Sequence, residues 1–174
     1  AALDLGKLVT AAMQDLSMAG GQLEIALIPL SEGGSNGLEQ IEFLVAGHAG
    51  STPRSLAKVA SGGELARISL AISVITSKAS FTPTLIFDEV DAGIGGAVAE
   101  TVGTLLRQLG ESHQILCVTH LPQVAAQGNH HLKVSKSQSG EKTLSQVSPL
   151  ARADRVEEVA RMLGGTTITD TTRR

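Results

Sequence analysis

One stretch constrains the fold of this chain more than any other: residues 84–96, TLIFDEVDAGIGG. Its first four residues are apolar or β-branched and follow Pro83, which predicts a short strand buried on both faces of a parallel sheet. Asp88 and Glu89 come where the strand ends. Two adjacent carboxylates repel each other and are costly to bury, so we expect a cation or water to hold them at the edge of the sheet.

An apolar strand that ends in Asp-Glu is the arrangement called Walker B. It predicts that Asp88 serves Mg²⁺, directly or through its water shell, and that Glu89 polarises a water aligned on a phosphate. The same pattern also occurs at ordinary strand ends, and that alternative stays open.

Two other stretches bear on this choice, SGGELAR from Ser61 and ILCVTH up to His120. A serine and two glycines before a helical pattern leave backbone N–H groups and a hydroxyl at a helix N-terminus, which predicts an anion site. In isolation they equally predict a plain N-cap, with Glu64 completing a capping box. His120 lies between a strand and the short helix that Pro122 begins, where it is either an exposed cap or a phosphate contact.

The order of these stretches is that of the later half of an ATP-binding-cassette ATPase domain. VASGGELARISLAI, LIFDEVDAGIGG and CVTHLPQVAA together resemble the RecN family of bacterial DNA double-strand-break repair ATPases, relatives of the structural-maintenance-of-chromosomes (SMC) proteins. Transporter ATPases usually continue the acidic pair with Pro or Ala, whereas Val90 follows Glu89 here, which favours the repair family. The resemblance extends over nearly the whole chain.

The family's phosphate-binding P-loop is missing, because no G-x-x-x-x-G-K-[S/T] occurs in the sequence. In the family it lies in an N-terminal half beyond a long coiled coil, so the resemblance implies the C-terminal half alone. The implied fold is α/β, the C-terminal lobe of an ABC-type ATPase head, with a partly parallel sheet and flanking helices. Residues 1–18 are expected to be a coiled-coil stub, 19–165 the C-terminal part of the head and 166–174 a frayed tail. By periodicity alone residues 5–16 equally fit a surface helix.

The resemblance also implies that ATP is held between two heads. Ser61, Gly62 and Gly63 would touch the γ-phosphate bound by the opposite subunit, and Glu64 is counted with them as nucleotide-binding.

The remaining implied roles belong to the residues near the two strand ends. Asp88 would hold Mg²⁺, Glu89 would act as general base, Asp91 would bridge subunits in a D-loop, and His120 would contact the γ-phosphate. As an alternative, Asp91 is an ordinary Asx-turn residue in a glycine-rich turn.

The implied partners are a P-loop-bearing N-terminal half, a second head in an ATP-bridged homodimer, and DNA ends or single strands in the full protein. The net charge of −3 over 174 residues does not indicate a surface that binds nucleic acid, which would require an excess of Lys and Arg. No apolar run is long enough to span a membrane, so a cytoplasmic location is expected, and the resemblance implies association with the nucleoid. Two alternatives remain: a head fragment of another SMC or nuclease-associated ATPase, or a non-catalytic interaction scaffold.

The other expected elements frame these motifs. Because the P-loop strand would insert beside the His120 strand, the chain is also expected to expose an apolar sheet edge.

The neighbouring His130 and His131 are expected to begin a strand, where they would point to opposite faces and make poor joint metal ligands. The patterns predict hairpins of residues 23–30 with 38–46 and of 130 onward with 143–147, a loop over 47–58, a strand over 114–119, and helices over 64–77, 98–109 and 154–163.

Overall fold

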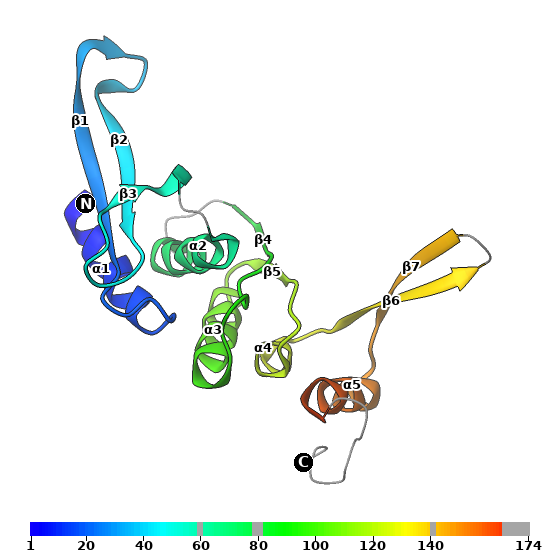
Figure 1. Ribbon diagram of the computed structural model, residues 1–174. Coiled ribbons are helices and arrows are strands. Elements are labelled where there is room, and N and C mark those ends of the chain that lie inside the picture. Colours follow the sequence, from blue (N-terminus) through cyan, green and yellow to red (C-terminus); the bar gives the residue numbers. More distant parts are fainter. Residues whose placement is uncertain (59–60, 78–81, 140–141, 165–174) are drawn as a thin grey trace.

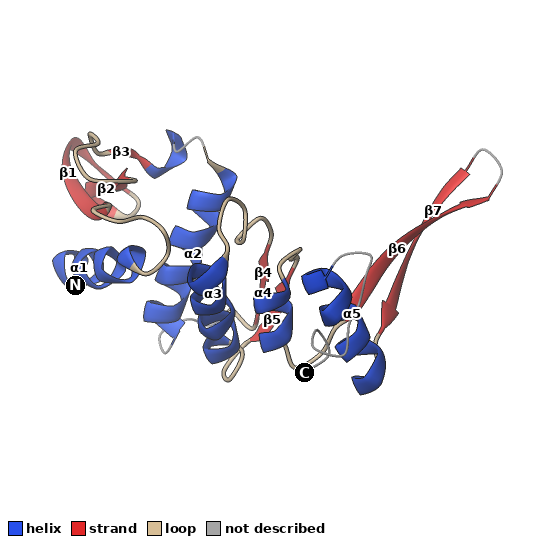
Figure 2. Ribbon diagram, turned by 60° about the horizontal axis from the view of Figure 1, so that its bottom comes forward, coloured by secondary structure: helices blue, strands red, loops and turns tan. Residues whose placement is uncertain are grey.

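The computed structural model describes residues 1–58, 61–77, 82–139 and 142–164. Two long hairpins project from a helical centre that packs on a short parallel sheet (Figures 1 and 2). The helices are α1 (Ala2–Gln14), α2 (Gly62–Thr76), α3 (Gly96–Leu109), α4 (Pro122–Gln127) and α5 (Arg152–Gly164), with a 3-10 turn η1 (Leu56–Lys58). The strands are β1 (Gln22–Gly34), β2 (Gly37–Ala46), β3 (Arg54–Ser55), β4 (Thr84–Phe87), β5 (Gln114–Cys117), β6 (Leu132–Ser139) and β7 (Lys142–Pro149).

The parallel sheet consists of β4 and β5 in the described part of the chain. Thr84 lies opposite Gln114 and Phe87 opposite Cys117, and the Val118 N–H donates to the Phe87 carbonyl at 2.9 Å. Parallel strands bring their carboxyl ends to one edge. The two stretches that follow these strands therefore lie at the same edge of the sheet.

The expectation that β4 is buried on both faces is wrong. Phe87 is 5% exposed, but its neighbour Ile86 is 70% exposed, because the described helices pack against one face of the sheet. Leu116 and Val118 of the β5 stretch are exposed as well. Among the described residues β5 pairs only with β4, so its other side is the free sheet edge that the sequence predicts. The uncovered face of the sheet is apolar as well.

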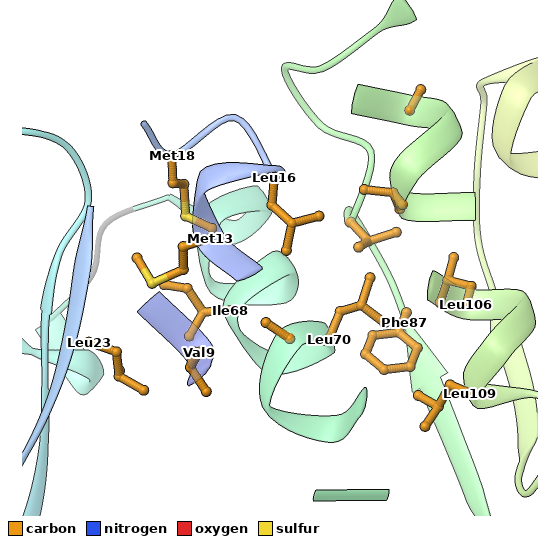
Figure 3. Close-up of a cluster of buried hydrophobic side chains, with 14 of the residues drawn as sticks. Val9, Met13, Leu16, Met18, Leu23, Ile68, Leu70, Phe87, Leu106 and Leu109 are labelled. Atoms are coloured by element: carbon orange, nitrogen blue, oxygen red, sulfur yellow. The ribbon is translucent and has the colours of Figure 1, made fainter. Parts of the chain in front are cut away.

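The core joins the N-terminal elements to this sheet. Val9 and Met13 of α1 lie with Ile68 of α2 in one half of the cluster, and Phe87 lies in the other half (Figure 3). Leu70 of α2 is fully buried in the same cluster. With few aromatic residues available, packed aliphatic side chains and methionines supply the hydrophobic stabilisation.

The spacing of Leu65, Ile68, Ile72 and Ile75 in the sequence predicts a single apolar face on α2, and this prediction is only partly confirmed. Ile68 is buried, but Leu65 is 40% exposed, while Leu70 on another side of the helix is 0% exposed. Because α2 packs against both α1 and α3, it is covered from more than one side, and a single-face pattern describes it poorly.

Both predicted hairpins are confirmed, with antiparallel pairing of β1 with β2 and of β6 with β7. The strand expected from His130 is corrected, since β6 begins at Leu132. The expected loop over 47–58 is corrected, since it contains β3 and η1. The helix expected from Asp154 begins at Arg152, so Asp154 lies in its first turn instead of capping it. The predicted frayed tail 166–174 lies outside the described residues.

An ion-pair cluster attaches the second hairpin to α5. The Glu158 carboxylate, 8% exposed, accepts from Lys133 Nζ of β6 at 2.6 Å and from Arg161 Nη2 at 2.6 Å. These bonds, the one from Arg161 foremost, outweigh the opposing effect of burial and lower the pKa of Glu158 from its ordinary 4.5 to about 2.

We expect Leu70→Ala to destabilise the chain by about 2–5 kcal/mol, because it leaves a cavity in the packed core. Leu65→Ala on the same helix is the matched control and should cost less than about 1 kcal/mol, because its side chain is already partly in water. Urea unfolding of both variants measures the difference, and equal losses would contradict the described packing.

The Glu158 cluster predicts a pH dependence of stability. Its folded-state pKa is depressed, so its contribution is complete above about pH 4.5 and is lost as the pH falls toward about 2. Both cationic partners are largely in solvent, so we expect a contribution on the order of 1 kcal/mol. Glu158→Gln should remove this part of the acid dependence in unfolding experiments, whereas Glu100→Gln at an exposed site of α3 should retain it.

Candidate functional site

The candidate site lies where the N-terminus of α2 meets the carboxyl ends of β4 and β5. The Glu89 carboxylate lies so close to Gly62 that a Cβ on that glycine would collide with Glu89 Oε2. Asp91 in turn contacts Thr119 and His120 beyond β5. The structure therefore gathers all three predicted stretches in one region.

Ser61 is the N-cap of α2. Its backbone is extended, with φ −98° and ψ 117°, and its Oγ accepts from the Glu64 N–H at 3.4 Å. Gly63 packs closely on Ala92, which lies in the turn after β4. A Cβ on Gly63 would lie 3.0 Å from both the Cβ and the carbonyl oxygen of Ala92. The SGG segment (residues 61–63) is thus a helix start whose second glycine is also required by packing.

The acidic pair forms a tight turn after β4. Asp88 is exposed, and its Oδ1 accepts from the Glu89 N–H at 2.9 Å. Glu89 has φ 56°, a left-handed conformation that non-glycine residues rarely adopt, and its carbonyl accepts from the Ala92 N–H at 3.0 Å. Strain of this kind is commonest at functional sites, and here it directs the Glu89 side chain toward α2.

Asp91 is a buried carboxylate, 3% exposed. Its Oδ2 accepts from Thr119 Oγ1 at 2.5 Å and from the His120 N–H at 2.9 Å, and His120 Nδ1 lies 3.3 Å away. The His120 side chain remains 72% exposed. Asp91 faces inward in this chain and holds His120 at the surface, whereas its expected contact across subunits stays a prediction. Thr119, which ends the strand predicted over 114–119, is a residue whose contact with Asp91 the sequence analysis missed.

Arg67 is a second residue that the sequence analysis missed. It is 5% exposed on α2, and its Nη1 donates to the Ala92 carbonyl at 2.8 Å. Burial lowers the pKa of its guanidinium, an effect that the nearby Glu64 charge opposes. No local pattern in the sequence indicates its burial, because the Ala92 carbonyl that it meets lies 25 residues further along the chain. Arg67 ties α2 to the turn that follows the acidic pair.

Cys117 lies beneath the site on β5. Burial, and then the negative charges of Asp91 and Asp88, raise the pKa of its thiol to about 12. A thiol with this pKa stays protonated at neutral pH and is a poor nucleophile.

The residues at this site fit a magnesium ion only when a bound nucleotide supplies further oxygen atoms to the metal. Within the described ranges no three His, Cys, Asp or Glu side chains gather into a metal-binding group. Asp88 offers an exposed carboxylate, and Mg²⁺ is usually held by one or two carboxylates plus phosphate oxygens and water. Asp88 therefore suits a metal that arrives with a nucleotide.

The architecture is that of SMC ATPase head domains. The Smc head domain of Pyrococcus yayanosii matches with a TM-score of 0.64 and 22% identity over 89% of this chain and 28% of that one. A structure from work on ATP-driven dimerization and DNA-stimulated activation of SMC ATPases matches with a TM-score of 0.56 and 21% identity, covering 94% of this chain and 92% of its own. At these identities the likeness establishes the fold class.

Sequence comparison gives the family. DNA repair protein RecN of Xylella fastidiosa is 52% identical over 167 residues, which are 95% of this chain and 30% of that protein. RecN of Vibrio cholerae is 50% identical over 172 residues, 98% of this chain and 31% of its own length. The chain belongs to the RecN family and matches the C-terminal part of its members. It spans about 30% of their length, less than the half that the resemblance implied, and no protein-family profile matches it.

None of the helices in the described part of the chain is long and apolar enough to cross a membrane.

We expect Asp91→Ala to destabilise the chain by roughly 1–3 kcal/mol, because it leaves the Thr119 hydroxyl and the His120 N–H without their acceptor. Asp88→Ala, in the same turn but at an exposed carboxylate, is the matched control and should cost much less. Chemical denaturation measures both changes, and a larger loss for Asp88→Ala would contradict the anchoring role of Asp91.

Proposed function

We propose that this chain is the C-terminal part of an SMC-like ATPase head that hydrolyses ATP between two associated heads in DNA double-strand-break repair and recombination. The convergence of the SGG segment, the acidic pair and His120 at one edge of the sheet carries the proposal. Phosphoryl transfer depends more on charges positioned around the phosphate and on an aligned water than on covalent chemistry. Backbone N–H groups, carboxylates and a histidine can supply that charge and that alignment.

The SGG segment would close over the nucleotide of the opposite head. Gly62 and Ser61 are exposed at the N-terminus of α2, where backbone N–H groups and the positive end of the helix dipole favour phosphate oxygens. Gly63 is buried and would act through its backbone, while the Glu64 carboxylate follows in the first turn.

The acidic pair and His120 would serve the nucleotide of their own head. Asp88 would hold Mg²⁺ beside the phosphates, and the metal would supply charge neutralisation there. Glu89 would take a proton from the attacking water, and His120, held by Asp91, would contact the γ-phosphate. Asp91 would bridge subunits through the turn that it closes.

The composite site requires partners. A P-loop-bearing N-terminal half would complete the head, and the exposed apolar Ile86, Leu116 and Val118 support a covering partner at the sheet. The solved SMC ATPase chain that matches over 92% of its own length is about as long as this chain. A second head would form the homodimer, and DNA would be the substrate of the whole protein, as the names of its relatives as DNA repair proteins suggest. We propose a cytoplasmic, nucleoid-associated location.

The two alternatives differ in what supports them. Identity of about 50% to RecN, against 22% to an Smc head domain, favours the repair family over another SMC or nuclease-associated ATPase. Two adjacent exposed carboxylates in a strained turn favour catalysis over a non-catalytic scaffold.

ATP turnover by this chain alone, and then mixed with the P-loop half, tests the proposal. We expect no turnover by the chain alone, turnover on mixing, and a fall by orders of magnitude in Glu89→Gln with ATP binding intact, because only the general base is lost. Glu111→Gln, at an exposed glutamate after α3, is the matched control.

Two results would contradict this prediction. Unchanged turnover in Glu89→Gln would remove Glu89 from the role of base. A stable complex with the P-loop half that never hydrolyses ATP would support the scaffold instead.

A further inference from the structure

The SGG segment and the acidic pair touch each other within this one chain. Glu89 Oε2 occupies the space that a Cβ on Gly62 would take. Glu89 reaches this place from its left-handed backbone, φ 56°, in the turn closed by the Ala92 N–H. The contact is therefore set from both sides, because the turn directs the carboxylate and the missing Cβ makes room for it.

This contact joins two residues that serve different ATP molecules in the proposed function. Gly62 would act on the nucleotide of the opposite head, and Glu89 on that of its own head. Since they are in van der Waals contact, neither can move without affecting the other. The positive end of the α2 dipole adds an attraction for the carboxylate at this position.

We propose that Gly62 is also a positioning residue in its own chain, which seats the Glu89 carboxylate and thereby links the two ATP sites of a head dimer. The inference rests on the proposed function. A phosphate that binds at residues 61–63 brings negative charge beside the seated carboxylate and displaces it by repulsion. Occupancy of one ATP site thus changes the position of the general base that serves the other.

The neighbouring glycine shows why position 62 is the informative one. A Cβ on Gly63 would press on the backbone and Cβ of Ala92 at 3.0 Å, so Gly63→Ala would disturb the fold. A Cβ on Gly62 would meet only the flexible end of Glu89. Gly62→Ala should therefore displace the carboxylate while the thermal unfolding midpoint stays close to that of the wild type. Gly34→Ala is the control substitution, since a Cβ there meets nothing nearer than Leu30 Cδ1 at 3.7 Å.

Mixed dimers of the full-length protein that carries this chain separate the two roles of Gly62. One protomer carries Gly62→Ala and its partner carries Glu89→Gln, each with its own affinity tag, so that both are recovered together. Only one ATP site of this dimer then has an active base. At that site Glu89 lies beside the substituted position 62 of its own chain, while the partner supplies an intact SGG segment. The reference dimer pairs a wild-type protomer, or one with Gly34→Ala, with the same Glu89→Gln partner.

We expect ATP hydrolysis in the Gly62→Ala mixed dimer to fall about 100-fold below the reference, as small misplacements of a reacting group do. Hydrolysis within about twofold of the reference would overturn the inference, because Gly62 would then act only across the interface. Equal turnover by wild-type and Glu89→Gln homodimers would instead overturn the proposed function, and this inference with it.

A double-mutant cycle in homodimers tests the same contact without mixed assembly. Glu89→Asp shortens the side chain by one methylene and withdraws it from the space beside Gly62. If the contact operates, Gly62→Ala lowers hydrolysis by a smaller factor in the Glu89→Asp background than in the wild type. Equal factors in the two backgrounds would overturn the inference, because the positions would then act independently.

Discussion

A buried carboxylate holds the candidate site together. Asp91 accepts from the Thr119 hydroxyl and the His120 N–H, so the turn after β4 is bound to the end of β5 by charge-assisted bonds. The Ala92 carbonyl of the same turn accepts from Arg67, which brings in the N-terminal part of α2. Through these two adjacent residues, segments far apart in the sequence acquire fixed relative positions.

The burial of Arg67 and Asp91 is stabilising only in combination with their partners. A guanidinium in a low-dielectric setting is costly, and the lowered pKa of Arg67 expresses that cost. The Ala92 carbonyl offsets part of it, and the Asp91 carboxylate is satisfied by Thr119 and His120 instead of by a cation. The result is a framework of polar contacts that lies beneath the exposed side chains of the candidate site.

The molecule is at the same time open on one side. One face of the β4–β5 sheet is covered by helices, while Ile86, Leu116 and Val118 are exposed on the other. The β6–β7 hairpin also extends away from the helical centre (Figure 1) and is attached at its base by the Glu158 cluster. Both features leave surface of this chain in solvent, and the chain spans about 30% of the length of the RecN proteins that it matches.

The sequence by itself determined the class of fold, the family and the positions of the polar groups, because these depend on local patterns: strand ends, a glycine-rich helix start and Pro122 at the start of α4. It predicted both hairpins for the same reason, since alternation and turn residues act over short distances. It could not show that Ile86 is exposed or that Leu70 is buried on a second side of α2, because burial depends on which neighbours a face meets. Only the tertiary structure decided that Asp91 turns inward, that Arg67 is buried against Ala92, and that Glu89 rests on Gly62. Those contacts join residues distant in sequence, and no local periodicity encodes them.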